Sequence, residues 1–234
     1  MSSYTARRLP RQRGPAAWNV ILGDQAPPEP LEGQQTADFV VVGAGFAGLS
    51  AARRLKQLEP NARVVVLEAD RIAAGAAGRN SGFMIDLPHD LASEDYAGAG
   101  DDKALIRLNR QAIAFGKEAA LAHNKSYAAH LGSLGEESET LDQDAMHELT
   151  GSRHYLGGLY TKGTVMLQPA GYIRGLAAGL SGDGVDIFEN SPVSAIHRQG
   201  SNWQVTTEKG AVSTPAVILT VNGHLESFGI ARGR

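Results

Sequence analysis

The sequence has 234 residues, of which 42% are hydrophobic and 20% charged, so it is long and apolar enough to bury a globular core. Its formal net charge of −3 gives no electrostatic basis for binding nucleic acid or an acidic membrane surface. The absence of cysteine excludes disulfides and thiolate metal sites in this chain, and we expect a cytoplasmic protein. The longest apolar stretch, residues 39–52, is interrupted by glycines and too short for a transmembrane segment, and the seven histidines form no metal-binding pair.

Residues 1–36 have the composition of a mobile arm followed by a linker. Four arginines fall between positions 7 and 13, but proline and glycine at positions 10, 14 and 15 interrupt any long amphipathic helix. No apolar segment follows, which disfavours a targeting peptide. Prolines at positions 27, 28 and 30 then predict a stiff approach to the first strand.

A glycine-rich turn follows the first predicted strand, residues 38–42. It reads Gly43-Ala44-Gly45-Phe46-Ala47-Gly48, the pattern G-x-G-x-x-G, and a helix is predicted directly after it. Gly43 permits the tight turn, Gly45 lets the backbone approach a pyrophosphate, and Gly48 lets the helix pack closely on the sheet. The N-terminus of that helix offers free N–H groups and a partial positive charge to phosphates.

The helix and the strand after it complete a βαβ unit. A second strand of buried type, residues 63–67, ends in Glu68, which lies 20 residues beyond Gly48. A carboxylate at this place accepts hydrogen bonds from an adenosine ribose and disfavours a 2′-phosphate, so FAD or NAD is expected rather than NADP. The helix is expected to place one apolar face on the sheet, formed by Ala47, Ala51, Leu55 and Leu58.

A second loop of small residues, residues 69–82, follows Glu68. Its glycines permit a close approach of the backbone to a ligand, and Arg79 offers the fork geometry that suits a phosphate or a carboxylate. We expect Arg79 and Asn80 to lie beside the cofactor rather than in solvent. The candidate cofactor contacts in this loop are Ala69, Gly75, Arg79, Asn80, Ser81 and Gly82.

The segment 68–82, E-A-D-R-I-A-A-G-A-A-G-R-N-S-G, resembles the flavin-contacting segment of the D-amino-acid oxidase-like family of FAD-dependent oxidoreductases. It is most similar to the bacterial γ-glutamylputrescine oxidase-like branch. The resemblance covers roughly residues 36–225. It implies FAD as the cofactor, a small amine or amino acid as the substrate, and an α/β fold. That fold is a Rossmann-like, glutathione-reductase-like FAD-binding domain with a small β-meander and a helical insertion.

The rest of the chain continues this resemblance. A helix is predicted after Gln168, with Ile173, Leu176, Ala177 and Leu180 on its apolar side, and a strand over residues 185–189. The meander spans residues 194–208, and a last strand begins at residue 216. By resemblance, Val193 meets the adenine through its backbone, while Thr220 and Gly223 return beneath the cofactor.

The expected domain organisation follows from these elements. Residues 37–90 and 165–225 form the FAD-binding domain, and residues 91–164, with a helix predicted over 141–149, form a mainly helical insertion of the substrate domain. Residues 226–234 form a truncated tail, because family members continue with most of the substrate sheet and a last FAD segment. We therefore expect the C-terminal half of the usual fold to be missing, and a second chain to be needed for turnover.

The expected reaction oxidises a C–N bond to an imine, with hydride transfer to flavin N5. The catalytic residues are not determined by any motif. Asp86 is a candidate partner for a cationic amine and His89 a candidate proton acceptor, because both follow the flavin-contacting segment. Two alternatives stay open at this point: an NAD-linked dehydrogenase, and a non-catalytic fragment or subunit that needs a second chain.

Overall fold

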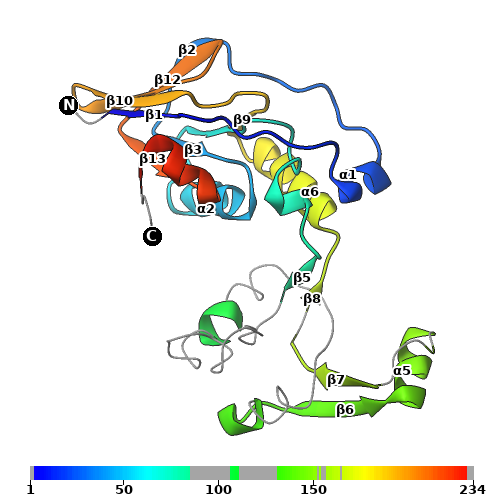
Figure 1. Ribbon diagram of the computed structural model, residues 1–234. Helices are drawn as coiled ribbons and strands as arrows, with labels where there is room; N and C mark the ends of the chain where they lie inside the picture. The colour runs from blue at the N-terminus through cyan, green and yellow to red at the C-terminus, as the bar shows by residue number, and fades with distance from the viewer. Residues whose placement is uncertain are drawn as a thin grey trace. The chain divides into compact units, whose positions relative to one another are not determined.

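A computed structural model describes residues 3–84, 106–110, 131–151, 153, 157–163 and 165–230 of the chain (Figure 1). The chain divides into two compact units. The first consists of Met1–Asn80 with Gln168–Arg234, and the second of Ser81–Leu167. The glycine-rich turn, residues 43–48, and all predicted cofactor contacts except Ser81 and Gly82 therefore lie in the first unit.

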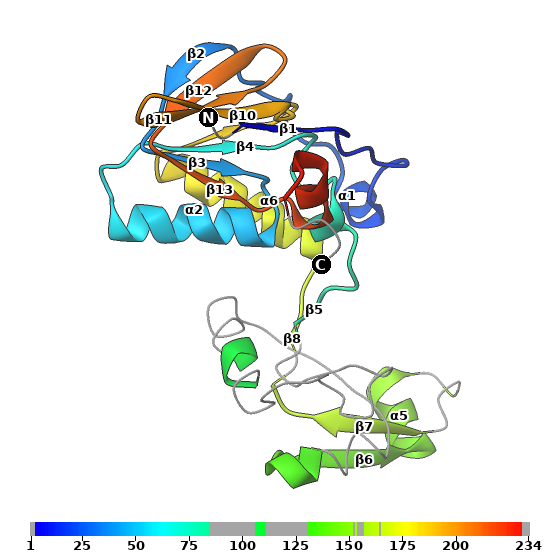
Figure 2. The same cartoon turned by 60° about the vertical axis from the view of Figure 1, so that its left-hand side comes forward.

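A parallel sheet in the order β13-β3-β4-β9 forms the centre of the first unit. Its strands are β3 (Phe39–Val42), β4 (Val64–Leu67), β9 (Val185–Phe188) and β13 (Ala216–Leu219). Valine-rich runs suit strands β3 and β4, because a central parallel strand is buried on both faces. Helices α2 (Phe46–Leu58) and α6 (Pro169–Gly182) cover one face of this sheet (Figure 2). The predicted Rossmann-like α/β architecture is confirmed.

A five-stranded sheet in the order β1-β10-β11-β12-β2 covers the opposite face. Strands β10 (Ala195–Gln199), β11 (Asn202–Thr206) and β12 (Gly210–Thr214) form the predicted meander. Alternate residues of the parallel sheet thus enter two different cores. Val41, Val64 and Val66 pack with the helices, whereas Val40, Val42 and Val65 pack with the meander.

The two sheets share a pair of long parallel segments. Strand β2 (Gly33–Thr36) runs parallel to β12. Both segments then cross into the parallel sheet, where β2 continues as β3 and β12 as β13. Gly33 lies opposite Gly210 in the first sheet, and Phe39 lies opposite Ala216 in the second, six residues further along both segments. The Oγ1 of Thr214 donates to the carbonyl of Asp38 at 3.1 Å where the segments cross. The register is therefore continuous across both sheets.

The buried face of α2 matches the predicted one only in part: Leu55 packs against the core and Ala51 is half-buried. The helix buries Gly48, Leu49 and Ala52, while Ala47 is exposed and Leu58 is 58% exposed. Gly48 faces the turn at Gly43, where no side chain would fit, so the buried face includes Gly48 rather than Ala47. The apolar side predicted for α6 is confirmed: Ile173, Ala177 and Leu180 are buried, and Leu176 packs against the same core.

Residues 3–36 are integrated into the first unit, where a mobile arm and linker were expected. Strand β1 (Ser3–Thr5) pairs antiparallel with β10, and β2 pairs with β12. Between them a short helix, α1 (Ala17–Leu22), packs near α6. These contacts depend on partners more than 150 residues away along the chain, such as His197 opposite Ser3, so local composition did not reveal them.

The described part of the second unit contains both helices and strands. Residues 85–105 and 111–130 lie outside the described residues, so the mainly helical insertion expected over residues 91–164 stays a prediction. Strands β6 (Ser138–Asp142) and β7 (Gly157–Thr161) form an antiparallel pair, with α5 (Gln143–Thr150) between them. The predicted helix over 141–149 exists but begins at Gln143, because the Asp142 side chain accepts a hydrogen bond from Ala145 N at 2.8 Å and caps it. Short strands β5 (Phe83–Met84) and β8 (Val165–Met166) also pair. Across the described ranges, no helix is long and apolar enough to cross a bilayer.

Candidate functional site

The first turn, residues 43–48, joins the end of β3 to the start of α2. Gly43 has a φ of +104°, which disfavours any residue with a Cβ, and a Cβ there would lie 2.9 Å from the carbonyl oxygen of Thr220. A Cβ on Gly48 would lie 1.8 Å from the carbonyl oxygen of Gly43. The two glycines are therefore required by the fold itself, as the pattern predicted for the turn and for helix packing.

Gly45 is different, because the protein leaves room for a side chain there. Its backbone is extended, with φ −83° and ψ −170°, and a Cβ would meet only the Cβ of Ala77, at 3.7 Å. Gly45 is the N-cap of α2, and no side chain caps this helix. An open space at an uncapped helix N-terminus suits an anionic ligand such as a pyrophosphate.

Glu68 follows the neighbouring strand, β4, and its side chain contacts the first turn. Its carboxylate accepts hydrogen bonds from Ala44 N at 2.7 Å and from Asp70 N at 3.1 Å. Burial raises the pKa of Glu68 above its ordinary value, and the backbone N–H donors oppose that rise. The predicted acid thus lies directly beside the first turn, at the end of β4.

The second turn, residues 72–80, lies beside the first turn: a Cβ built on Gly45 would be 3.7 Å from the Cβ of Ala77. A short 3₁₀ helix, η1 (Ala76–Gly78), forms its centre, and Gly75 is the N-cap with φ −82° and ψ −162°. A Cβ on Gly78 would lie 1.9 Å from the carbonyl oxygen of Ala73. Ala73 itself has a φ of +62°. Residues 73, 75 and 78 therefore repeat the geometry of residues 43, 45 and 48.

Arg79 and Asn80 end the second turn, and both are exposed in the first unit. The Arg79 guanidinium donates to the carbonyl of Ala74, at 2.7 Å, and to that of Gly14. The side-chain amide of Asn80 donates to the carbonyls of Ala76 and Ala77, at 3.3 and 2.8 Å. These contacts hold the turn in shape, and a direct role of Arg79 and Asn80 at the cofactor stays a prediction.

The remaining predicted contacts fall in different places. Thr220 donates through Oγ1 to the carbonyls of Val42, at 2.8 Å, and Gly43, at 3.1 Å, and so supports the first turn. Val193 is buried in the core between the sheets, and Gly223 is exposed in a 3₁₀ segment, η2 (Asn222–Phe228). The ring of Phe46 lies 5.8 Å from that of Tyr172 on α6. Ala69 is half-buried, between Glu68 and Asp70.

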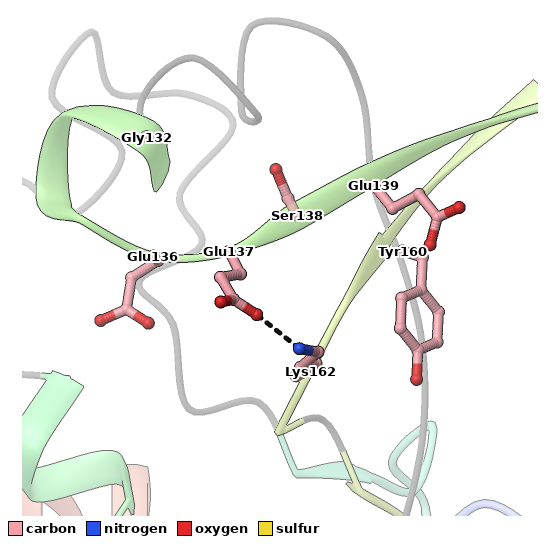
Figure 3. A pocket seen from close by; sticks show the side chains of 7 residues that line it. All are labelled: Gly132, Glu136, Glu137, Ser138, Glu139, Tyr160 and Lys162. Carbon is pink, nitrogen blue, oxygen red and sulfur yellow. Dashed lines mark hydrogen bonds and ion pairs between the residues drawn. The ribbon is translucent and has the colours of Figure 1, made fainter.

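Four predicted residues lie beyond this site. Ser81 and Gly82 belong to the second unit, and Asp86 and His89 lie outside the described residues. The second unit also has a cavity of about 480 Å³ of its own, which Figure 3 shows beside the β6–β7 pair. Its lining includes Tyr160 and the ion pair of Lys162 with Glu137, whose hydrogen bond lowers the pKa of that carboxyl. None of the predicted cofactor contacts line this cavity.

The contribution of the N-terminal segment to the site was not predicted. Residues 12–26, which we call the N-terminal strap, run along the second turn. Its side chains donate to that turn's carbonyls: Trp18 Nε1 to Asn80 at 2.8 Å, Asn19 Nδ2 to Ala73 at 3.0 Å, and Gln25 Nε2 to Ile72 at 3.0 Å. The only local signal was the aromatic and amide pair Trp18-Asn19, in a segment that otherwise has no recognisable motif.

The fold and the first turn define a dinucleotide-binding protein of the Rossmann-like class. Residues 38–232 match the family model described as FAD dependent oxidoreductase, DAO, and the chain belongs to this family. Its cofactor is therefore FAD, which resolves the choice between FAD and NAD that the acid at Glu68 left open. Among the described residues, no group of three or more His, Asp or Glu side chains is placed to hold a metal ion.

Individual relatives agree with the family. The chain is 32% identical to Probable oxidoreductase OrdL of Haemophilus influenzae, over 84% of this chain and 51% of that protein. It is 29% identical to gamma-glutamylputrescine oxidoreductase of Escherichia coli K12, over 86% of this chain and 52% of that protein. Glycine oxidase from Geobacillus kaustophilus shares the fold, with a TM-score of 0.63 and 17% identity over 83% of this chain and 58% of that one. The chain spans about half the length of the curated relatives it matches.

Proposed function

We propose that this chain is the FAD-binding portion of an enzyme that oxidises the C–N bond of an amine or amino acid to an imine. The observation that carries the proposal is the geometry at Gly45: the one glycine of the first turn with open space at its Cβ position lies at the uncapped N-terminus of α2. The substrate class rests on relatives named for gamma-glutamylputrescine and glycine. It is a proposal for the whole protein.

The residues of the first unit fit FAD by their chemistry. The N–H groups at the start of α2 would hold the pyrophosphate, and the Glu68 carboxylate would accept hydrogen bonds from the adenosine ribose. Thr220 fixes the carbonyls of Val42 and Gly43, so the first turn is rigid before any ligand arrives. The second turn would hold the part of the cofactor beyond the pyrophosphate.

The chemistry divides between cofactor and protein. FAD, when bound, supplies the hydride acceptor at N5. The protein has to orient the substrate so that the carbon bearing the amine faces that acceptor, and to exclude water from the site. The hydride leaves carbon, the proton leaves nitrogen, and the resulting imine is hydrolysed by water. Asp86 is proposed to hold the cationic amine and His89 to accept the proton.

Two measurements on the purified protein test the proposal. Titration with FAD and with NAD, followed by flavin fluorescence and by calorimetry, should give one FAD per chain and no NAD binding at comparable concentration. Preferential binding of NAD would overturn the cofactor assignment, and binding of neither would support the non-catalytic alternative.

The second measurement tests the bond that is oxidised. Because we expect a second chain to be needed for turnover, this measurement uses the whole protein loaded with FAD. Anaerobic mixing with γ-glutamylputrescine or glycine should bleach the flavin absorbance, and 2-hydroxy acids serve as the control class. The control is needed because another relative, at 22% identity, is named L-2-hydroxyglutarate dehydrogenase. Bleaching by hydroxy acids alone would overturn the assignment of a C–N bond.

A further inference from the structure

The second turn depends on contacts from outside its own sequence. It belongs to neither sheet, and its centre consists of alanine and glycine, which provide few side-chain contacts. Ala73 holds a φ of +62°, a conformation that costs a residue with a Cβ about 1 kcal/mol. Such a turn keeps one conformation only when its surroundings fix it. In this unit the support comes from α6, from the Glu189 carboxylate, which accepts a hydrogen bond from Ile72 N, and from the N-terminal strap.

Trp18 is the central residue of the strap. Its indole Nε1 donates to the carbonyl of Asn80 at 2.8 Å, and its own carbonyl accepts from Gln168 Nε2 at 2.9 Å. Asn80 is the last residue of the first unit before the chain enters Ser81–Leu167, and Gln168 is the first residue after it. Trp18 therefore binds both points at which the chain leaves and rejoins the first unit.

The contact at Asn80 continues to the cofactor site. The Asn80 side chain donates to the carbonyls of Ala76 and Ala77, and so holds η1 in place. Ala77 in turn is the nearest neighbour of the open space at Gly45, at 3.7 Å from a Cβ built there. A continuous series of contacts thus runs from Trp18 through Asn80 and η1 to the space between the two turns.

We propose that Trp18 is a positioning residue for the cofactor: it holds the second turn in the conformation that binds the flavin-side part of FAD. This inference rests on the proposed function for its ligand, but the conformation of the turn can be measured without any ligand. Asn19 acts at the other end of the same turn, because its Nδ2 donates to the carbonyl of Ala73 at 3.0 Å.

The test uses Trp18→Phe, which removes the N–H donor and keeps an aromatic ring. Trp203→Phe is the matched control, since Trp203 lies on β11 against Tyr4 and Arg198, away from both turns. Amide hydrogen exchange in the absence of FAD should rise about five- to tenfold for Gly78 and Arg79 in Trp18→Phe, and stay unchanged for residues 43–49. Both reporter amides are protected by hydrogen bonds inside the turn, to the carbonyls of Gly75 and Ala76.

Ligand affinity is the second readout. Trp18→Phe should weaken FAD binding about five- to tenfold and change ADP binding less than twofold, because ADP is expected to contact only the first turn and Glu68. Unchanged exchange at Gly78 and Arg79 would overturn the inference, and so would faster exchange with unchanged FAD affinity. If the parent chain binds no FAD, the cofactor role is refuted with the proposed function, while the exchange experiment still decides what Trp18 does to the turn. If Trp18→Phe does not fold, Asn19→Ala replaces it, with faster exchange expected at Ala74.

Discussion

The first and second turns have the same local geometry and different supports. In each turn a residue with positive φ is followed two positions later by an extended glycine that caps a helix, and five positions later by a glycine with no room for a Cβ. The first turn is held from below by the sheet, through Thr220 and the ends of β3 and β4. The second turn accepts hydrogen bonds from Trp18 and Asn19 of the N-terminal strap. The sheet thus supports the first turn from its own strands, whereas the second turn, which lies outside both sheets, depends on contacts from other segments.

Gly48→Ala should have the largest effect on the fold. The new methyl would collide with the Gly43 carbonyl, which is fixed by the sheet and cannot move away, so we expect a loss of about 3 kcal/mol or more in the free energy of unfolding. Urea unfolding followed by circular dichroism measures it. Gly45→Ala, three residues away and with open space, is the control and should change stability by less than about 0.5 kcal/mol.

Gly45→Val should separate binding from folding in the same turn. Its backbone conformation is open to any residue, so the unfolding free energy should stay within about 1 kcal/mol of the parent. The branched side chain occupies the space proposed for the pyrophosphate, and FAD affinity should fall about 100-fold, or about 2.7 kcal/mol. Undiminished FAD affinity in this variant would refute the assignment of the phosphate site.

Gly78→Ala is the counterpart of Gly48→Ala in the second turn. The collision with the Ala73 carbonyl is as close, at 1.9 Å, but the second turn can shift because no strand holds it. We therefore expect a smaller loss, about 1–2 kcal/mol, measured in the same urea experiment. Gly75→Ala is its neutral control, since its Cβ would meet only the flexible Gln12 side chain, at 3.8 Å. Equal losses at Gly48 and Gly78 would contradict the difference in support.

The pH dependence of FAD binding should come from Glu68, whose carboxylate accepts a hydrogen bond from Ala44 N of the first turn. Because burial raises its pKa, this carboxyl takes up a proton at a higher pH than an ordinary glutamate and then loses its ability to accept from the ribose. FAD affinity should therefore be full above the pKa of Glu68 and fall by up to about tenfold per pH unit below it. Fluorescence titrations over a pH series measure this, with Glu68→Ala as the control that should abolish the dependence.

Ala73→Gly should have the smallest effect. It relieves the positive φ of Ala73, which contributes about 1 kcal/mol, but it adds backbone entropy to the unfolded chain and removes a buried methyl, which together cost about as much. We expect a net change within about 0.5 kcal/mol. The converse change in the first turn, Gly43→Ala, should be severe, because the added Cβ also meets the Thr220 carbonyl. Similar results at positions 43 and 73 would mean that the two turns are supported alike.

The difference between the two turns also explains which parts of the site could be predicted from the sequence. Gly43, Gly48 and Glu68 could be placed because strand, turn, helix and strand are adjacent in the chain and obey short-range rules. The strap could not, because Trp18 meets Asn80 and Gln168 only after the fold has formed. The face of α2 was predicted only in part, with Leu55 on the core but Ala47 exposed, because periodicity alone does not register the contact between Gly48 and Gly43.

The meander shows what pattern reasoning does well, and the second unit what it does not. Alternating residues separated by turns located β10 and β11, since their pairing is local. Strands β6 and β7 pair across α5, so Ser138 meets Thr161, and neither strand has an alternation strong enough to reveal it. The expectation of a mainly helical insertion did not anticipate this strand pair.

The register shared by the two sheets has a further consequence. Side chains of β3 and β4 that point to opposite faces are nearly all valines, so a slip by one residue would exchange one valine for another and scarcely change what is buried. The sequences of these strands alone therefore do little to fix their register. The register is fixed instead by the two segments that cross between the sheets, which are equal in length: six residues from Gly33 to Phe39 and six from Gly210 to Ala216. The pairing of β2 with β12 therefore sets the register of β3 with β13. An insertion or deletion between β2 and β3 would shift that register unless one of equal length occurred between β12 and β13.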